Sequence, residues 1–411
     1  MARRALILVE GHRRMGLQYV QAAQRLGVHP ITLCADPSRY DYVAAEGIEA
    51  IQVDTDNLEA LIHESFRLCA TYDIAGITGI SDVEEAVYAT AAKLCRHFDL
   101  PGPNPASIER CCDKFTQRQL LKEAGVPIPA YRLASNATEV ESSAAVIGLP
   151  VVLKPAVGSG SVGVRLCRNV DELAEHTTYL LDGSHIWPSS PRILVEEFAQ
   201  GPLYWADIMG HQIIGIGIGD FGPPPHFISR ESTIPAPLNG NEHERVADVS
   251  LSCLRALGLG WGPTGIEFRW TKRGPVVIEV NPRLHGAPTP QLIQLAYGLD
   301  LITEHIKLVI GDECDLRRRH SQTAAARYLN PDRDGTLDWI DGDSQAAAIP
   351  GVAEIKFYVE PKTPIVRKGD SRDTIGHVIA VSPTRAETEA ILQRAVESID
   401  WVITPFSTLG E

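Results

Sequence analysis

Glu267, Glu279 and Asn281 are the residues of this sequence best suited to bind a metal ion together. They fall in two expected strands, Gly265–Trp270 and Pro275–Asn281, joined by a short turn that ends in a glycine. In a hairpin centred on that turn, the two glutamates lie directly opposite each other, with side chains ~5 Å apart. The asparagine points to the same face. Oxygen ligands of this kind suit Mg²⁺, which commonly bridges substrate phosphates, so the pattern predicts a magnesium site.

The alternative for this hairpin is an exposed turn with two solvated acids. The second strand disfavours it, because most of its other side chains are apolar: Val276, Val277, Ile278 and Val280. We therefore expect a buried strand, in which carboxylates are costly unless a cation lies between them.

A glycine-rich loop could bind phosphate groups. The apolar strand Pro150–Pro155 carries Lys154 near its end, the loop Gly158–Gly163 follows, and a second strand covers Val164–Cys167. This is not a P-loop, which needs GxxxxGK[ST] at the start of a helix. Backbone N–H groups in such a loop can bind a polyphosphate, and Lys154 supplies a point charge. The alternative is a mobile hairpin tip beside a partly buried lysine.

Two further segments have meaning only in context. Lys114 lies at the start of a predicted helix and, taken alone, is a solvated helix lysine. The apolar strand Arg192–Phe198 ends in Glu196, Glu197 and Phe198. Its two acids could bind an adenine amino group through side-chain or backbone carbonyls, with the phenylalanine covering the ring. Equally, the strand could simply end in solvent.

The N-terminal region alternates strands with helices, which predicts a doubly wound sheet. The expected strands are Ala5–Val9, His29–Cys34, Ile51–Val53 and Ile74–Thr78. The loop Glu10–Gly16 is not GxGxxG, so a dinucleotide site is only weakly indicated. Asp36 could bind a ribose or cap a turn.

Two loops at the carboxyl ends of these strands are candidates for the walls of a substrate cleft. They are Glu10–Gly16 and Ser81–Glu85. For Ser81–Glu85 the simpler interpretation is a well-capped helix N-terminus, since serine and acids are favoured there.

The whole chain has the composition of an ordinary globular protein of 411 residues, enough for about two to four domains. Three prolines within 101–105 predict a domain boundary near residue 103. The net charge of −14 disfavours a general nucleic-acid binder. Eight cysteines without paired CxxC spacing indicate reduced thiols, and with no signal peptide a cytoplasmic location is expected. No apolar run approaches the ~20 residues that span a membrane.

Taken in order, the motifs resemble the ATP-grasp superfamily over residues 105–310. They are Asp113-Lys114, Leu153-Lys154-Pro155, Gly158–Gly163, Val195-Glu196-Glu197-Phe198, Glu267 and Glu279-Val280-Asn281-Pro282-Arg283. Within the superfamily the chain looks most like carboxylate–amine ligases that join amino acids. The resemblance implies an α/β (α+β) ATP-grasp fold in three parts: a Rossmann-like N-terminal domain over 1–103, an ATP-grasp domain over 104–310 with its lid subdomain at about 115–190, and an α+β domain over 311–411 similar to the C-terminal domain of L-amino-acid ligases.

The resemblance also implies a role for each motif. ATP would be bound by Lys114, Lys154, the loop residues Ser159, Gly160 and Ser161, and the adenine-binding Glu196, Glu197 and Phe198. One or two Mg²⁺ ions, with Mn²⁺ as a substitute, would be held by Glu267, Glu279 and Asn281. Arg283 would stabilise the transferred phosphoryl group or an acyl phosphate.

Two positions depart from the family pattern. Many members bind ribose through an acid where this chain has Leu203, which leaves Asp207 as a substitute candidate. Amino-acid ligases often carry a glutamate and a histidine for the substrate amino group where this chain has Ser229 and Ser232, with Glu231 between them. The substrate is therefore not required to be a typical free amino acid.

The expected activity is an ATP- and Mg²⁺-dependent ligase that joins a small carboxylic acid to an amine through an acyl phosphate, with ADP as a product. The expected partners are amino-acid-like small molecules, with no nucleic acid and no membrane. Dimerisation is an expectation from the family, with no interface placed. Other readings of the same motifs are an ATP-grasp carboxylase, an acid–carrier-protein ligase and a nucleotide-binding protein without turnover.

Overall fold

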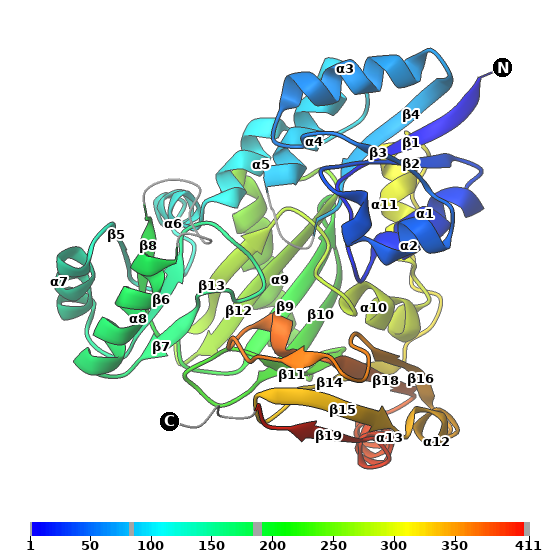
Figure 1. Cartoon of the computed structure of the whole chain (residues 1–411). Helices are drawn as coiled ribbons and strands as arrows, with labels where there is room; N and C mark the ends of the chain where they lie inside the picture. Colours follow the sequence, from blue (N-terminus) through cyan, green and yellow to red (C-terminus); the bar gives the residue numbers. More distant parts are fainter. Residues whose placement is uncertain (1, 82–85, 184–190, 407–411) are drawn as a thin grey trace.

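The N-terminal unit is a parallel sheet with helices on both faces (Figure 1). The structure is a computed structural model, and it describes residues 2–81, 86–183 and 191–406. The strand order is β3-β2-β1-β4, with β1 Arg3–Val9, β2 His29–Cys34, β3 Glu49–Gln52 and β4 Tyr72–Gly79. The helices of this unit are α1 Gly16–Arg25, α2 Asp41–Ala45, α3 Leu58–Cys69 and α4 Ala86–His97. The predicted doubly wound sheet is confirmed.

Strand β1 shows why this sheet is buried on both faces. Leu6 and Leu8 pack with α1, whereas Ile7 and Val9 pack in the cluster that contains α3 and α4. Because side chains alternate along a strand, a continuous apolar run places one set on each face. The Glu10–Gly16 loop follows the end of β1 and lies on the side of the sheet that faces the rest of the molecule (Figure 1).

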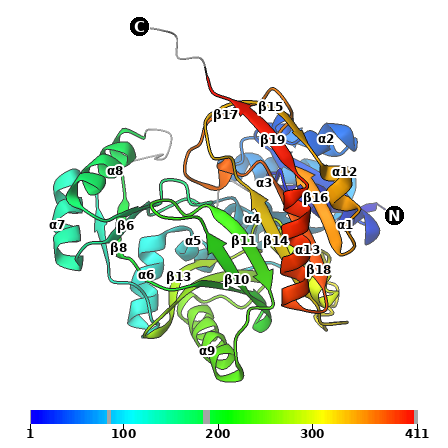
Figure 2. The same cartoon turned by 90° about the horizontal axis from the view of Figure 1, so that it is seen from below.

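Residues 131–183 and 191–197, which include the region expected to be the lid, form a small antiparallel sheet with two helices on one side (Figures 1 and 2); we keep the name lid for this unit. Its strand order is β5-β8-β6-β7, with β5 Tyr131–Ala134, β6 Val151–Pro155, β7 Arg165–Cys167 and β8 Ile193–Glu197. The helices are α7 Ala137–Ile147 and α8 Val170–Asp182. Two helices, α5 Pro105–Cys112 and α6 Lys114–Glu123, connect the N-terminal unit to the lid.

The centre of the molecule is an eight-stranded sheet of order β13-β12-β9-β10-β11-β14-β18-β16. Its first five strands are β13 Gly274–Asn281, β12 Pro263–Thr271, β9 Leu203–Met209, β10 Gln212–Phe221 and β11 Ser229–Ile234. Helix α9 Gly240–Leu257 packs on one face, against Ile266, Phe268 and Val280. Residues of the opposite parity, Glu267 and Glu279 among them, therefore lie on the other face.

The C-terminal residues complete this same sheet. The added strands are β14 Thr323–Leu329, β16 Val352–Phe357 and β18 Gly376–Ser382. Helix α13 Arg385–Glu397 packs across them (Figure 2). Beyond them lie a three-stranded sheet and a short helix: β15 Gly335–Asp341, β17 Pro364–Ile365, β19 Asp400–Thr404 and α12 Asp343–Ala347. Helices α10 Thr289–Tyr297 and α11 Leu301–Val309 join the central sheet to the N-terminal unit.

The mixed α/β fold matches the expectation from the sequence. No helix among the described residues is long and apolar enough to cross a bilayer. All eight cysteines are free thiols.

Candidate active site

The predicted pairing of the two hairpin acids is present in the structure, but the register shifts by one residue between the turn and that pair. Strands β12 and β13 are antiparallel, Glu267 is the direct partner of Glu279, and Gly265 is the partner of Asn281. Gly274 closes the turn with a φ of 101°, a conformation that favours glycine. One bulge follows Glu267, so that the next pair is Phe268 with Val277.

The two facing acids have opposite electrostatic environments. Burial and the nearby Glu279 carboxylate together raise the pKa of Glu267. Burial also favours the neutral form of Glu279, but Lys114 and Lys154 outweigh it and lower the pKa of that group. His285, Arg283 and Lys154 act in the opposite direction on the pKa of Glu267, but they do not outweigh burial and Glu279. A divalent cation between the pair would relieve this repulsion, so the donor set fits Mg²⁺.

Lys114 joins the hairpin to the glycine loop. Its Nζ lies 2.9 Å from Glu279 Oε1 and donates a hydrogen bond to the backbone oxygen of Gly158. Its backbone N–H donates to the oxygen of Ala156 at 2.7 Å. The lysine is thus buried at the site and is not a solvated helix residue. Across the described ranges no three His, Cys, Asp or Glu side chains converge as a metal cluster, which leaves the two acids and the Asn281 amide as the predicted set.

Lys154 belongs to a buried ionic triad. Its Nζ lies 2.6 Å from Glu196 Oε2, and the Nε of Arg118 lies 2.5 Å from Glu196 Oε1. Arg118 has no exposed surface, and its guanidinium also donates to the oxygen of Ile278 on β13. The Glu196 carboxylate is therefore directed at two cations, which leaves only its backbone for the predicted adenine contact. Sequence reasoning missed Arg118, because an arginine in an amphipathic helix ordinarily points to solvent.

We expect Glu196→Gln to lower the free energy of unfolding by about 3–5 kcal/mol, because it leaves two buried cations without their anion. Denaturant unfolding followed by circular dichroism measures this loss. The matched control is Glu197→Gln, since Glu197 is partly exposed and pairs at 3.2 Å with the exposed Arg273. An exposed pair of this kind contributes less than about 1 kcal/mol. Equal losses in the two variants would contradict a buried triad.

The ion pairs of Glu196 also predict how the free energy of unfolding depends on pH. Burial raises its pKa, but Arg118 and Lys154 outweigh burial, so the pKa lies below the ordinary value for a glutamate. A depressed folded-state pKa contributes stability that is present above the unfolded pKa and lost as the pH falls through the folded pKa. The stability difference between the wild-type protein and Glu196→Gln should therefore shrink on acidification.

The glycine loop lies between the lid and the C-terminal residues. The backbone oxygen of Gly160 accepts a hydrogen bond of 3.1 Å from the N–H of Ser371, and Ser371 O accepts one of 3.4 Å from Arg14. Gly160 and Gly163 adopt positive φ values. Ser159 and Ser161 are half-buried beside them. The loop is therefore held near both neighbouring units, where it can cover a polyphosphate.

A cavity of about 420 Å³ opens at the hinge between the lid and the central sheet. Phe198, Leu203, Phe227 and Arg269 line it, which agrees with an aromatic cover for a planar base. The Arg269 guanidinium lies 5.8 Å from the centre of the Phe227 ring and donates to the oxygen of Gly201 at 2.8 Å. Arg269 is the direct strand partner of Leu203, so a guanidinium lies beside the position of the expected ribose-binding acid.

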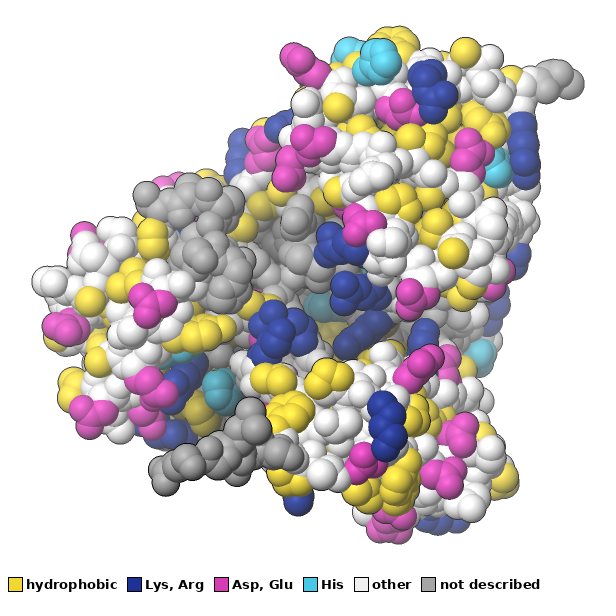
Figure 3. Space-filling view, viewed as in Figure 1, with side chains coloured by type: hydrophobic (Ala, Val, Ile, Leu, Met, Phe, Trp, Pro, Cys, Tyr) yellow, Lys and Arg dark blue, Asp and Glu magenta, His cyan; other side chains and the backbone are white. Residues whose placement is uncertain are grey.

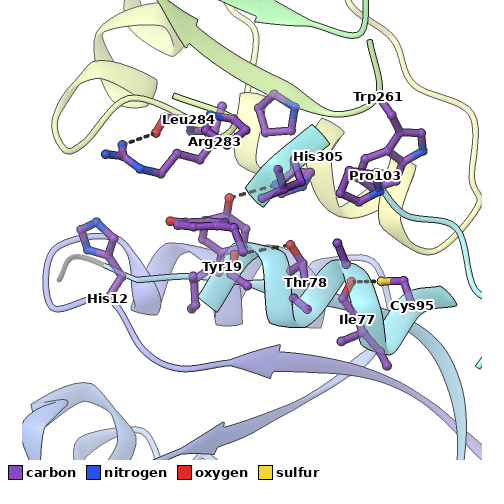
Figure 4. Close-up of a pocket in the computed structure, with 18 of the residues that line it drawn as sticks. His12, Tyr19, Ile77, Thr78, Cys95, Pro103, Trp261, Arg283, Leu284 and His305 are labelled. Atoms are coloured by element: carbon purple, nitrogen blue, oxygen red, sulfur yellow. Dashed lines mark hydrogen bonds between the residues drawn. The ribbon is translucent and has the colours of Figure 1, made fainter. Parts of the chain in front are cut away.

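Arg283 lies where the hairpin meets the N-terminal unit (Figure 4). Its guanidinium donates to Leu284 O at 3.1 Å and acts electrostatically on Glu267, Glu279 and His12. Burial, followed by Arg283 and Arg14, lowers the pKa of His12 to about 3, so this imidazole is neutral. His12 Nδ1 accepts from the N–H groups of Arg14 and Met15, each at 3.2 Å.

Figure 4 shows the mainly apolar pocket that extends from Arg283 into the interior. Tyr19 OH and His305 Nδ1 are 2.9 Å apart inside it, and Trp261 closes its far end. His12 and Met15 contribute from the loop that the sequence placed at a substrate cleft. Of the second proposed wall, Ser81–Glu85, the residues 82–85 lie outside the described residues. Figure 3 shows lysine and arginine side chains gathered around the hollow between the three units.

Three other candidate residues are bound by side chains that lie next to them in the fold. Asp36 accepts hydrogen bonds from Ser38 and so caps a turn. The Nε and one terminal nitrogen of Arg327 donate to Glu231 Oε2 at 2.9 and 2.5 Å, so the positive charge of the arginine balances the carboxylate. Asp207 lies four residues beyond Leu203 on β9, where it pairs with His285.

Two family models and a solved structure match this chain. The sequence-family model of the carbamoyl-phosphate synthase L chain, ATP-binding domain, matches residues 113–317. The family model of the L-amino acid ligase C-terminal domain 2 matches residues 327–404. The crystal structure of an L-amino acid ligase from Bacillus licheniformis superimposes with a TM-score of 0.83 at 18% identity, over 98% of this chain and 100% of the other.

Two related sequences extend the comparison. The protein y4rH of Sinorhizobium fredii (strain NBRC 101917 / NGR234), described as uncharacterized, is 63% identical over 409 residues, which is 100% of this chain and 85% of y4rH. Human carnosine synthase 1 is 28% identical over 240 residues, which is 54% of this chain and 29% of the synthase.

The chain belongs to the ATP-grasp superfamily of ATP-dependent enzymes. Its relatives include carnosine synthases and biotin carboxylases, and the homologues in this superfamily use ATP and Mg²⁺.

Proposed function

We propose that this protein is an ADP-forming ligase that joins a small carboxylic acid to an amine through an acyl phosphate. The observation that carries the proposal is the facing pair Glu267 and Glu279, with Lys114, Lys154 and Arg283 all acting on it electrostatically. A carboxylate accepts an amine only after one of its oxygens becomes a leaving group, and phosphorylation by ATP achieves this. The site has the charges that such a transfer requires.

Each residue has a task in this reaction. Lys114 and Lys154 bind the phosphates of ATP, and the Ser159–Ser161 segment covers them. Glu267, Glu279 and Asn281 would hold Mg²⁺, which supplies charge neutralisation at the phosphate oxygens. Arg283 binds the transferred phosphoryl group next to the acid. Closure of the loop excludes water, which would otherwise hydrolyse the acyl phosphate.

The substrates are amino-acid-like on this proposal. Supporting it, the C-terminal residues match a domain described for L-amino acid ligases, and 240 residues of the chain align with carnosine synthase; both proteins are named for products or substrates of this class. Where the family pattern has a glutamate and a histidine for the amino group, this chain has Ser229 and Ser232, and the Glu231 between them is bound by Arg327.

The test is a phosphate-release screen over pairs of acids and amines, with mass spectrometry of the products. We expect release that requires both an acid and an amine, together with an amide product. Release that depends on bicarbonate instead would identify a carboxylase, and transfer to a carrier thiol would identify a carrier-protein ligase. No release with any pair would indicate a nucleotide-binding protein. Each of these three outcomes overturns the proposal.

A further inference from the structure

Asp207 and His285 form a buried pair that the proposed phosphoryl transfer does not use. His285 Nδ1 lies 2.8 Å from Asp207 Oδ1, and the two residues are 8% and 2% exposed. Asp207 comes from β9, and His285 follows the hairpin by four residues. Two elements far apart in the sequence thus bring an imidazole and a carboxylate together next to the candidate metal site.

The pair lies on the same face of the central sheet as Glu267. Asp207 is the strand partner of Gly265, and Glu267 is the partner of Trp205, two positions along the same ladder. The imidazole lies over Gly265, because a Cβ built on that glycine would be 2.6 Å from His285 Cε1. A glycine at this position therefore leaves the space that the ring occupies, beside the floor of the active site.

Each residue of the pair keeps one polar atom without a partner among the described residues. These atoms are Asp207 Oδ2 and His285 Nε2, and both are buried. A buried polar group without a hydrogen bond costs about 1–3 kcal/mol. A pair built only for stability would satisfy both atoms, so the arrangement indicates that a ligand group makes these bonds.

The geometry of the pair is that of an oriented base. The Nδ1–H donates to Asp207, so that a neutral imidazole carries its lone pair on Nε2. A carboxylate behind an imidazole holds the ring in this tautomer and stabilises the imidazolium that forms when Nε2 gains a proton. Burial lowers the pKa of His285, but Asp207 and then Glu267 outweigh burial, and the pKa lies above its ordinary value.

We propose that His285 is the general base of the amine step, with Asp207 as its positioning residue. The inference rests on the proposed ligase function. An amine arrives mainly as an ammonium at neutral pH. His285 Nε2 takes one proton from it, and the nitrogen lone pair attacks the acyl phosphate carbonyl. The C–N bond forms, the bond from carbon to the phosphate oxygen breaks with its electron pair going to that oxygen, and the departing phosphate takes up the second proton lost by the nitrogen and leaves as hydrogen phosphate.

Hydroxylamine provides a direct test, because it is largely unprotonated at neutral pH and needs no base before it attacks. It also traps acyl phosphates as hydroxamates. We expect His285→Gln to lower amide formation by about 10²–10⁴-fold, the usual contribution of a general base. The rate of hydroxamate formation from the same acid should stay within a few-fold of the wild-type rate. Asp207→Asn should show the same split, in a weaker form.

The matched control is His243→Gln, since His243 is exposed on α9, away from the pair. It should leave both rates unchanged. Equal loss of amide and hydroxamate in His285→Gln would assign His285 to structure or to the acid-activating step, and unchanged rates would assign it no role; either result overturns the inference. Absence of hydroxamate from the wild-type protein would instead overturn the proposed function, so the two failures are distinguishable.

Discussion

Glu279→Ala is expected to reduce ADP formation by ~10³-fold or more, because a lost metal ligand removes several kcal/mol of charge stabilisation from the transition state. Glu279 contacts two other residues of the proposed site: it faces Glu267 across the hairpin, and its carboxylate lies 2.9 Å from the Lys114 ammonium group. Its removal also relieves the repulsion that raises the pKa of Glu267. Coupled ADP release at saturating substrate, with Mg²⁺ varied, measures the effect.

The control for this variant is Glu109→Ala. Glu109 pairs with Lys93 on the surface, where both side chains are well exposed, so it changes the same residue type without touching the site. Far-ultraviolet circular dichroism should show the wild-type fold in both variants. If Glu279→Ala kept near-normal metal-dependent turnover, the assignment of this acid to the metal would be wrong.

Arg283→Ala is expected to lower turnover by ~10³-fold while it weakens ATP binding only a few-fold. An arginine that contacts the transferred phosphoryl group acts mainly in the transition state, where its contribution is of this size. The structure supports this placement, since Arg283 acts on both hairpin acids and borders the apolar pocket. Steady-state kinetics gives the turnover, and calorimetric titration with a non-hydrolysable ATP analogue gives the binding.

Arg317→Ala is the matched control, because the Arg317 side chain is highly exposed and pairs with its near neighbour Asp315 on the surface. Arg317→Ala should change neither the turnover nor the affinity for the ATP analogue. Equal losses of turnover and nucleotide affinity in Arg283→Ala would place the arginine at the bound nucleotide and not at the reacting phosphate.

The two strands of the hairpin, and the alternation that puts Glu279 and Asn281 on one face, were predictable because their causes are local. Glycine at 274 closes the turn, but Thr271 pairs with Gly274, and the bulge after Glu267 is what brings Glu267 opposite Glu279. Continuous apolar runs such as Ala5–Val9 likewise identify buried parallel strands. In each case a few neighbouring residues determine the result.

The contacts of the buried charges were not predictable, because they join elements far apart in the chain. Arg118 and Glu196 are separated by 78 positions, as are Asp207 and His285. No local pattern marks an arginine that will lose all contact with solvent, or a histidine that will lie over a glycine of another strand. The sequence left the adenine contact of Glu196 to either its side chain or its backbone, and the structure directs the carboxylate to Arg118 and Lys154.

The extension of the central sheet by the C-terminal residues was also beyond local reasoning. β14 pairs with β11 and β18, so the residues after 311 continue the sheet that bears the site. The sequence indicated strands there but not their neighbours, because pairing depends on which edge the rest of the chain leaves open.

The measurement that tests the central claim most directly is the transfer of ¹⁸O from the acid to phosphate. Acids from the productive pairs, labelled with ¹⁸O in the carboxylate, are converted with unlabelled ATP and an amine, and the released phosphate is analysed by mass spectrometry. Attack of the carboxylate on the γ-phosphorus predicts one ¹⁸O in each phosphate released. Phosphate without the label, formed at the same rate as the amide, would contradict an acyl phosphate and with it the role assigned to this site.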